Sequence, residues 1–512
     1  MALSDTAFIL PFVNSGADSA DLFALLAEFH KAEAASDGPD VQRIPYFRWQ
    51  GSIPERDREQ LRVIVDKACT RDENAPETIA VAAGILMRLT NDQPAAVRTL
   101  QSLVPALLVN CRDQTVLFEL GNIFRALPNW PLLQKIARTC VEVFSEKQWQ
   151  ANIACDWLML ANYRLLVKKF EANSLCEDHI NLLEAEINLL AEKIGENTKN
   201  IAFYRSLALT LRNQIEDAVA WTLKAQKLPG KILVLFRRLE SFIPLEELER
   251  RPSAAFLQLE KSVVHHFDHQ APDAGVLLVS VDGQYFDQYH AKLLESFAYW
   301  NPGGLVHIHC VNFEPGPGQL SQLEKTYNLG INYSIDRRPE LSEAPNLYAG
   351  YCAGARYLYL PRYLERYGKV AVSDIDGVIR VPLADLWKDD NRAVYITSKL
   401  VSPEWSSTRL LWEAIAAGSL AIADAPPNRE FAWMLANYLA GQINFCRDQG
   451  LRLFYTDQIG LLLAFVASKD TCDFRPLAGL FTQQGRWKLV GAGDAKTKFQ
   501  NAFNYKKPIE EI

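Results

Sequence analysis

Two aspartates one residue apart follow a short apolar run in the C-terminal half of the chain. The run Val370–Ser373 leads directly into Asp374, Ile375, Asp376 and Gly377. Alternate residues of an extended segment point the same way, so both carboxylates can face one ion. Hard divalent cations prefer oxygen ligands, which makes a Mg²⁺ or Mn²⁺ site one interpretation. A solvated turn after a strand is the other, because Asp-Gly is a turn dipeptide.

The elements that would position this pair are strands alternating with helices. Apolar runs separated by amphipathic stretches predict an α/β domain with a mostly parallel, Rossmann-like sheet. The aspartates then stand at the carboxyl end of a strand, where open α/β sheets bind their ligands. The predicted strands are 275–281, 305–311, 331–335 and the run into Asp374, with helices over 287–300 and 348–367.

The preceding half has a different pattern of apolar residues. The fold class predicted for the whole chain is therefore all-α plus α/β. Residues 1–55 predict an irregular lead-in with a helix over 19–35, and apolar positions from 56 onward follow a helical period. A helix-like stretch continues to His269, and Pro272 then marks the predicted boundary. The predicted domains are residues 1–55, 56–270 and 271–512.

A spacing recurs three times inside the helical half. A large residue is followed by leucine and then by a small residue at 117–121, at 157–161 and at 204–208. This spacing resembles the first helix of a tetratricopeptide repeat, although the intervals are irregular and Lys224 replaces the aromatic residue expected in the last second helix. The half is interpreted as a degenerate array or as stacked helical hairpins; an ordinary helical bundle is the alternative. Such surfaces usually bind peptides or proteins, so a protein partner is expected.

Composition limits the class of protein. The 512 residues carry a formal net charge of -7, which argues against a general nucleic-acid binder. The nine cysteines are scattered without a Cys-x-x-Cys pair, as in a reducing compartment. No signal peptide is recognisable, and no apolar run is long enough for a transmembrane segment. These features predict a cytoplasmic protein.

Beyond the aspartate pair, four further segments resemble the GT-A glycosyltransferases of family 8 and its relatives. Asp374-Ile375-Asp376 is similar to their DXD motif. The order and spacing agree over roughly residues 275–500. The other segments are Ala355–Leu364 with its arginine, Val381–Trp387, the small-residue strand Ala417–Ile422, and Tyr455–Gln458 with its Asp-Gln pair.

The resemblance implies an enzyme that moves a sugar from a nucleotide diphosphate donor, UDP-linked, to a protein or glycan acceptor with retention of configuration. It implies Mn²⁺ or Mg²⁺ as cofactor. The implied catalytic residues are Asp457 and Gln458. The implied nucleotide-sugar-binding residues are Ser280, Asp282, Tyr289, Arg356, Asp374, Lys496 and Lys498.

The implied metal ligands are Asp374, Asp376 and a third group. Family members usually supply a late histidine, whereas this chain has no histidine after His309. Asp494 stands near the expected place and is the proposed substitute. The plainer alternatives remain open: an ion pair for Arg356, a helix cap for Asp457, and solvated lysines at 496 and 498.

Two functions from other classes compete with the transferase. Ser373–Val378 also matches the first motif of haloacid-dehalogenase phosphatases, where Asp374 would be the nucleophile and Asp376 the general acid/base. Thr397 or Ser398 would then bind phosphate, and Asp494 would supply the late acidic motif. That fold begins with the motif strand, whereas about 95 residues of α/β pattern precede it here. The third possibility is a non-catalytic scaffold built on helical repeats.

Overall fold

The computed structural model divides by its contacts into two compact units. One comprises residues 1–208 with 224–237, and the other comprises residues 209–223 with 238–512. Among the described helices, none combines the length and apolar character that crossing a bilayer requires. The structure describes residues 19–35, 53–70, 75–90, 98, 100–125, 129–144, 149–172, 174–228, 241–316, 318–388, 392–398, 400–401, 410–453 and 455–477.

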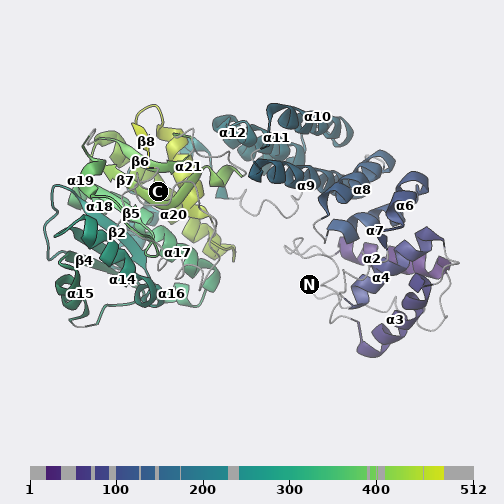
Figure 1. Cartoon of the computed structure of the whole chain (residues 1–512), viewed down its shortest axis with the longest axis horizontal. Helices are drawn as coiled ribbons and strands as arrows, with labels where there is room; N and C mark the ends of the chain where they lie inside the picture. The colour runs from purple at the N-terminus through teal and green to yellow at the C-terminus, as the bar shows by residue number, and fades with distance from the viewer. Residues whose placement is uncertain are drawn as a thin grey trace. The chain divides into compact units, whose positions relative to one another are not determined.

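The first unit is helical, as the sequence predicts, and helices that are near in sequence pack against one another (Figure 1). The predicted helix over 19–35 is confirmed as α2. Its helices are α2 (Ser19–Ala35), α3 (Glu55–Thr70), α4 (Pro76–Thr90), α6 (Val104–Asn110), α7 (Gln114–Arg125), α8 (Trp130–Val143), α9 (Trp149–Glu171), α10 (Glu177–Ile194) and most of α11 (Lys199–Leu211). The helix α12 (Ile215–Lys227) follows and is divided between the two units.

The three segments with recurring spacing lie in α7, α9 and α11, each followed by a second helix. Gly121 of α7 shows why the small position matters. A Cβ atom there would lie 2.0 Å from the ring of Trp157, which is completely buried. The glycine therefore admits the large first residue of the next helix pair, and the two helices approach closely.

A buried ionic cluster joins α2, α4 and α7. Arg88 Nη1 lies 2.7 Å from Glu119 Oε1, and His30 Nε2 lies 2.8 Å from Glu119 Oε2. Gly84 leaves room for it, because a Cβ atom there would lie 2.4 Å from the Glu119 side chain. Burial alone would raise the pKa of Glu119, but Arg88 and His30 outweigh it and hold the pKa at about 2.

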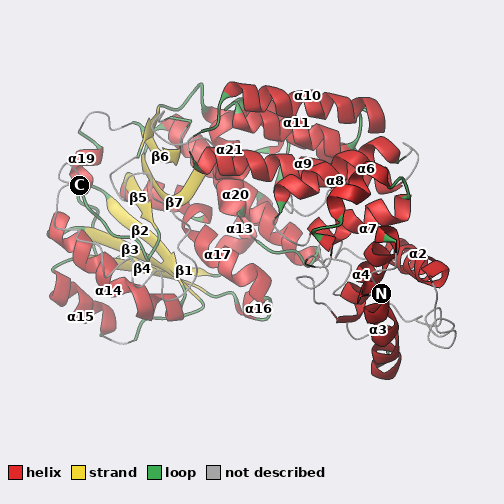
Figure 2. Ribbon diagram, turned by 45° about the vertical axis from the view of Figure 1, so that its right-hand side comes forward, coloured by secondary structure: helices red, strands yellow, loops and turns green. Residues whose placement is uncertain are grey.

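The second unit contains an eight-stranded sheet in the order β1-β4-β3-β2-β5-β7-β6-β8 (Figure 2). Neighbouring strands run parallel except at the β1–β4, β5–β7 and β7–β6 pairs. The mostly parallel sheet is therefore confirmed. Its strands are β1 (Val263–His266), β2 (Val276–Val281), β3 (Leu305–Val311), β4 (Gly330–Asp336), β5 (Lys369–Ser373), β6 (Val394–Ser398), β7 (Ile415–Ala423) and β8 (Phe474–Pro476).

Helices cover both faces of this sheet. One face packs an apolar core with α14 and α15, and the other meets α17, α18 and α20. The elements outside the sheet are η4 (Leu245–Glu247), α13 (Ala254–Glu260), α14 (Gly283–Trp300), α15 (Gln319–Tyr327), α16 (Pro339–Ser342), α17 (Pro345–Leu358), α18 (Leu360–Tyr367), α19 (Leu383–Leu386), η5 (Leu411–Glu413), α20 (Pro426–Asp448) and α21 (Thr456–Ser468).

The second face is polar over β3 and β4. His307 Nδ1 lies 2.8 Å from the hydroxyl of Tyr367, and His309 Nδ1 lies 2.7 Å from that of Tyr363. All four side chains lie in the interior, and burial holds the pKa of His307 well below its usual value. Two buried histidine–tyrosine hydrogen bonds therefore attach α18 to the sheet.

Two local predictions were wrong. The helix-like stretch ending at His269 contains strand β1, which pairs with β4 at the edge of the sheet, so the α/β unit begins upstream of the predicted boundary near 270. The helix predicted over 348–367 is interrupted at Tyr359, where α17 ends and α18 begins. Pro361 explains the interruption, because proline has no N–H to continue the helical ladder.

Candidate functional site

The candidate site begins where the direction of the sheet's connections reverses. Strands β3 and β4 lie on one side of β2, whereas β5 lies on the other. The carboxyl ends of β2 and β5 therefore flank the switch point, which is where open α/β sheets bind ligands. Asp282 follows β2 and Asp374 follows β5, so the sequence placed both carboxylates at the correct edge.

The aspartate pair is shaped by a turn rather than by a strand. Strand β5 ends at Ser373, and the Gly377 N–H donates to the Asp374 carbonyl at 3.0 Å. A Cβ atom at Gly377 would lie 2.7 Å from Ser373 Oγ, so this tight closure requires glycine. The expectation that Asp374 and Asp376 share one extended segment was wrong, although both side chains remain half-buried.

Arg356 reaches Asp374 from helix α17. Its Nη1 lies 2.7 Å from Asp374 Oδ1, and its Nη2 donates to the Ala417 carbonyl at 2.9 Å. The side chain of Arg356 is only 3% exposed, compared with 31% for Asp374. The ion-pair alternative for Arg356 is thus correct in part. The pair is however mostly enclosed and stands at the switch point, not on a helix surface.

A bulge in β7 provides the second acceptor of Arg356. Opposite consecutive residues Ile396 and Thr397 of β6, strand β7 places Leu420 and Ala416. Residues 417–419 therefore have no partner in the backbone ladder with β6, as in a β-bulge. The Ala417 carbonyl is free to accept from Arg356 and also from the Tyr357 hydroxyl at 2.6 Å.

The same bulge holds the aspartate turn. The Gly418 carbonyl accepts from the Asp374 N–H at 3.0 Å. The small-residue strand predicted at 417–422 therefore lies beside the aspartates, as part of β7. The sequence analysis did not predict the role of the Ala417 and Gly418 carbonyls. Every residue has a backbone carbonyl, so residue types do not show which of them accept such hydrogen bonds.

Asp457 contributes a third charge from the first turn of α21. Its carboxylate accepts from the Gln458 N–H at 2.9 Å, so it does bind the helix terminus as the plainer alternative proposed. Burial raises the pKa of Asp457, and the nearby guanidinium of Arg356 partly opposes that shift. Asp457 is enclosed by protein but retains some solvent access.

Backbone strain adjoins Asp457. Tyr455, the residue before α21, has a φ of 59° in the left-handed region. This conformation costs roughly 1–2 kcal/mol for a residue that is not glycine. Strain of this kind persists where the surrounding structure enforces it, and such positions cluster at functional sites.

Three buried polar atoms of these segments have no hydrogen-bond partner within the described part of the chain. They are Arg356 Nε, Thr456 Oγ1 and Gln458 Oε1. An unsatisfied buried polar group costs about 1–3 kcal/mol. All three atoms belong to segments in which the sequence placed candidate site residues.

The remaining predicted residues have other surroundings. Ser280 Oγ donates to the Cys352 carbonyl at 2.5 Å. Asp282 accepts from the Tyr285 N–H at 2.8 Å and so caps α14. Tyr289 is 1% exposed within the apolar core, so it does not line this edge. The helical spacing that places it with Leu293 already indicated this core position.

Besides the aspartate pair, the phosphatase alternative uses Thr397, Ser398 and Asp494. The first two form hydrogen bonds within the protein, and Asp494 lies outside the described residues. Thr397 Oγ1 lies 3.1 Å from Ser419 Oγ, and Ser398 Oγ donates to the Ala414 carbonyl at 2.7 Å. Both side chains are buried. Lys496, Lys498 and Asp494 lie outside the described residues.

A complete metal site is not present in the described part of the chain, where no group of three or more His, Cys, Asp or Glu side chains could hold an ion. Asp374 and Asp376 alone provide carboxylates after β5. Two carboxylates suit a cation such as Mg²⁺, which keeps waters and takes its remaining ligands from substrate phosphates. The two carboxylates therefore fit a cation that is bound jointly by protein and substrate, and not one that is bound by protein groups alone.

Comparison with known proteins adds little. No protein-family model matches the chain, and no curated protein matches it. Among solved structures, the chain is similar to one described as the apo structure of WbbM, a bifunctional glycosyltransferase. The likeness has 14% sequence identity, a TM-score of 0.28 and a coverage of 73% of each chain. A TM-score this low does not establish a shared fold.

Proposed function

We propose that this protein is a glycosyltransferase that uses a nucleotide diphosphate sugar, UDP-linked, and transfers the sugar to a protein or glycan acceptor with retention of configuration. The observation that carries the proposal is the convergence of Arg356, Asp374 and Asp457 at the switch point of the sheet. A guanidinium and two carboxylates, with buried polar atoms on the same segments, suit a charged, hydroxyl-rich ligand.

The diphosphate would be recognised through charge. Arg356 is held by Asp374 and Ala417, and its Nε has no partner within the described residues. A guanidinium in a fixed orientation binds phosphate oxygens with strong, directional hydrogen bonds. Asp374 and Asp376 would hold Mn²⁺ or Mg²⁺ together with the phosphates. When bound, the cation neutralises charge on the departing diphosphate.

The sugar would lie toward the start of α21. Asp457 and Gln458 are the catalytic residues of the proposal. Asp457 is an enclosed carboxylate, and Gln458 Oε1 is a buried acceptor that lacks a donor. Sugar hydroxyls are donors that match both groups. The Arg356 guanidinium favours the ionised form of Asp457, in which it can accept a proton or face developing positive charge.

Ligand-induced thermal stabilisation tests the proposal. A ligand that binds only the folded state raises the unfolding temperature, so the full chain is heated with Mn²⁺ and each of a panel of UDP-, GDP-, ADP- and CMP-sugars. We expect a shift with a UDP-sugar that Asp374→Ala removes, and donor hydrolysis that the same variant abolishes. Lys388→Ala, in an exposed ion pair with Asp385, is the matched control.

Two results would reject the transferase. A shift with vanadate but with no nucleotide sugar would favour the phosphatase, in which Asp374 attacks phosphorus. No shift with any of these ligands would favour a scaffold that binds partners through its helical unit. Full donor hydrolysis by Asp374→Ala would also overturn the assignment of this residue.

A further inference from the structure

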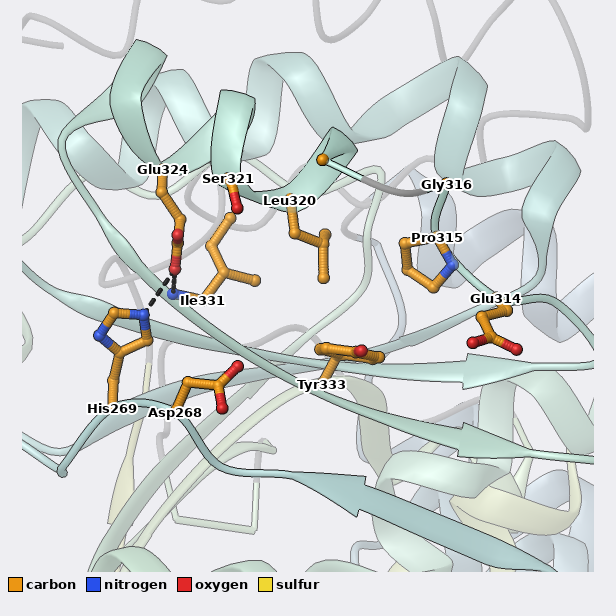
Figure 3. A pocket seen from close by; sticks show the side chains of 11 residues that line it. Asp268, His269, Glu314, Pro315, Gly316, Leu320, Ser321, Glu324, Ile331 and Tyr333 are labelled. Carbon is orange, nitrogen blue, oxygen red and sulfur yellow. Dashed lines mark hydrogen bonds and ion pairs between the residues drawn. The ribbon is translucent and has the colours of Figure 1, made fainter.

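A second groove lies away from the aspartates, on the β1 side of the sheet (Figure 3). It has a volume of about 590 Å³ and lies between helix α15, strand β4 and the segment that follows β1. This volume suits a small ligand. None of the residues that line it belongs to the candidate site. They are Asp268, His269, Glu314, Pro315, Gly316, Gly318, Leu320, Ser321, Glu324, Ile331 and Tyr333.

An aromatic ring occupies the middle of the groove. Figure 3 shows Tyr333 between the His269–Glu324 pair and Glu314, with Leu320 on the α15 side. The ring of His266 stacks against Tyr333, with centroids 4.3 Å apart and planes 10° apart. The stack is fixed by register, because the two residues face each other across the β1–β4 pair. Tyr333 therefore offers a preset apolar surface with a hydroxyl at its tip.

Two of the three carboxylates that line the groove, Glu324 and Glu314, are already oriented by partners. Glu324 Oε1 lies 2.6 Å from His269 Nε2 and accepts from the Ile331 N–H at 3.0 Å. At the other end, Glu314 Oε2 lies 2.9 Å from Arg337 Nη2. These carboxylates retain further lone pairs, so they can still accept hydrogen bonds from neutral donors.

We propose that this groove binds a neutral saccharide. A pyranose ring would pack its C–H face on Tyr333, and its hydroxyls would donate to Glu314 and Glu324. An aromatic surface between hydrogen-bond acceptors matches a sugar, which has an apolar face and a polar rim. The proposal does not depend on transferase activity, because none of the residues that line the groove belongs to the candidate site around Asp374.

Saturation-transfer NMR on the full chain tests this proposal. The probes are maltotriose, mannotriose and chitotriose at millimolar concentration, with spermidine as a cationic comparison. We expect transfer to at least one trisaccharide. Tyr333→Ala should weaken that binding about tenfold, equivalent to about 1.4 kcal/mol. Tyr333→Phe keeps the ring and should remain within about twofold.

Two matched variants separate the groove from the fold and from the transferase. Tyr299→Ala removes a tyrosine of α14 that is 50% exposed, and it should bind as the unaltered chain does. Asp374→Ala should also bind normally, even where it abolishes donor hydrolysis. Because Tyr333 borders the core, Glu314→Ala on the exposed rim is the decisive variant if Tyr333→Ala fails to fold. It should weaken binding by about threefold or more.

Three outcomes would overturn the proposal. One is no transfer to any trisaccharide. Another is unchanged binding in a folded Tyr333→Ala or in Glu314→Ala. The third is spermidine binding that the groove variants abolish while no sugar binds, which would assign the groove to cations.

Discussion

Arg356 and Asp374 form an ion pair of 2.7 Å in which the arginine is nearly enclosed and the aspartate is not. The guanidinium is also anchored to the Ala417 carbonyl at 2.9 Å. The arginine therefore has two fixed contacts, while the carboxylate keeps an open side toward solvent. This asymmetry makes the arginine the positioning partner and leaves the aspartate accessible to a ligand.

Replacing Arg356 by lysine should preserve the positive charge but lose the paired contacts of the guanidinium with Asp374 and Ala417. A lysine has one nitrogen and cannot bind Asp374 and Ala417 in the same way. Losing one hydrogen bond to a charged group costs about 1.5–3 kcal/mol, so donor hydrolysis should fall about 10- to 100-fold. Arg362→Lys is the control, because Arg362 binds Glu260 on α13 instead. Equal steady-state rates for both variants would contradict the role given to Arg356.

Asp457→Asn should stabilise the protein while reducing its activity. Burial raises the pKa of Asp457, so the folded state holds the proton more tightly than the unfolded chain. The ionised form then costs stability at neutral pH, and this cost disappears as the pH falls below the unfolded value. Thermal unfolding from pH 4 to pH 8 should show asparagine raising the midpoint most at high pH. A gain that is largest in acid would have the wrong sign.

Gly350→Ala should disturb the segment that carries Asp457. A Cβ atom at Gly350 of α17 would lie 1.9 Å from the Leu453 carbonyl oxygen, just before α21. Overpacking typically costs about 1–3 kcal/mol, and the shift should also lower donor hydrolysis. Gly354→Ala, one turn along the same helix, is the control, because its nearest contact would be 3.9 Å from Leu439. It should be neutral or stabilising by up to about 1 kcal/mol. Denaturant unfolding of both variants distinguishes these outcomes.

Glu119→Ala should strongly destabilise the helical unit. It leaves Arg88 buried without its carboxylate, which costs about 3–5 kcal/mol. The double change Arg88→Met with Glu119→Leu should recover most of that loss, since it removes both buried charges. Glu196→Ala, which breaks an exposed pair with Arg205, should cost at most about 1 kcal/mol. Urea titration measures all three, and an additive double variant would contradict the pairing.

Acid should weaken the same cluster. The pKa of Glu119 is about 2 in the folded state, below its usual 4.5. Its stabilising contribution is therefore complete above about pH 4.5 and is lost as the pH falls toward 2. The difference in unfolding free energy between the unaltered chain and the double variant should shrink over this interval.

Local signals in the sequence were sufficient for the main strands and for the edge of the sheet that holds the aspartates. Strands β2, β3 and β5 are short, mostly apolar runs with few polar residues, and such runs indicate buried parallel strands without long-range information. Strand β1 was missed because its residues, Val263–His266, have little alternation and gain their partner β4 from about 70 residues away. An edge strand of this kind has no signature in its own residues.

The sequence identified residues of the candidate site by their types, but it did not predict the contacts between them. Arg356, Asp374 and Asp457 were selected individually, whereas the Arg356–Ala417 bond joins positions 61 residues apart through a backbone carbonyl. The turn closed by Gly377 likewise replaced the extended geometry expected for Asp376. Tyr289 was chosen for its residue type, which can bind a nucleotide. Its position on the apolar face of the helix instead places it in the core.

The bulge of β7 is needed for the contacts of the candidate site but not for the pairing of the sheet. Residues 417–419 have no partner in the backbone ladder with β6, so a chain that lost these three residues could continue the β6–β7 ladder without interruption. The sheet would survive, but Arg356 and Tyr357 would lose their common acceptor. If the proposed function is correct, deletion of these three residues should therefore abolish activity and leave the chain folded. The length of this segment should therefore distinguish active from inactive members in any set of similarly folded chains.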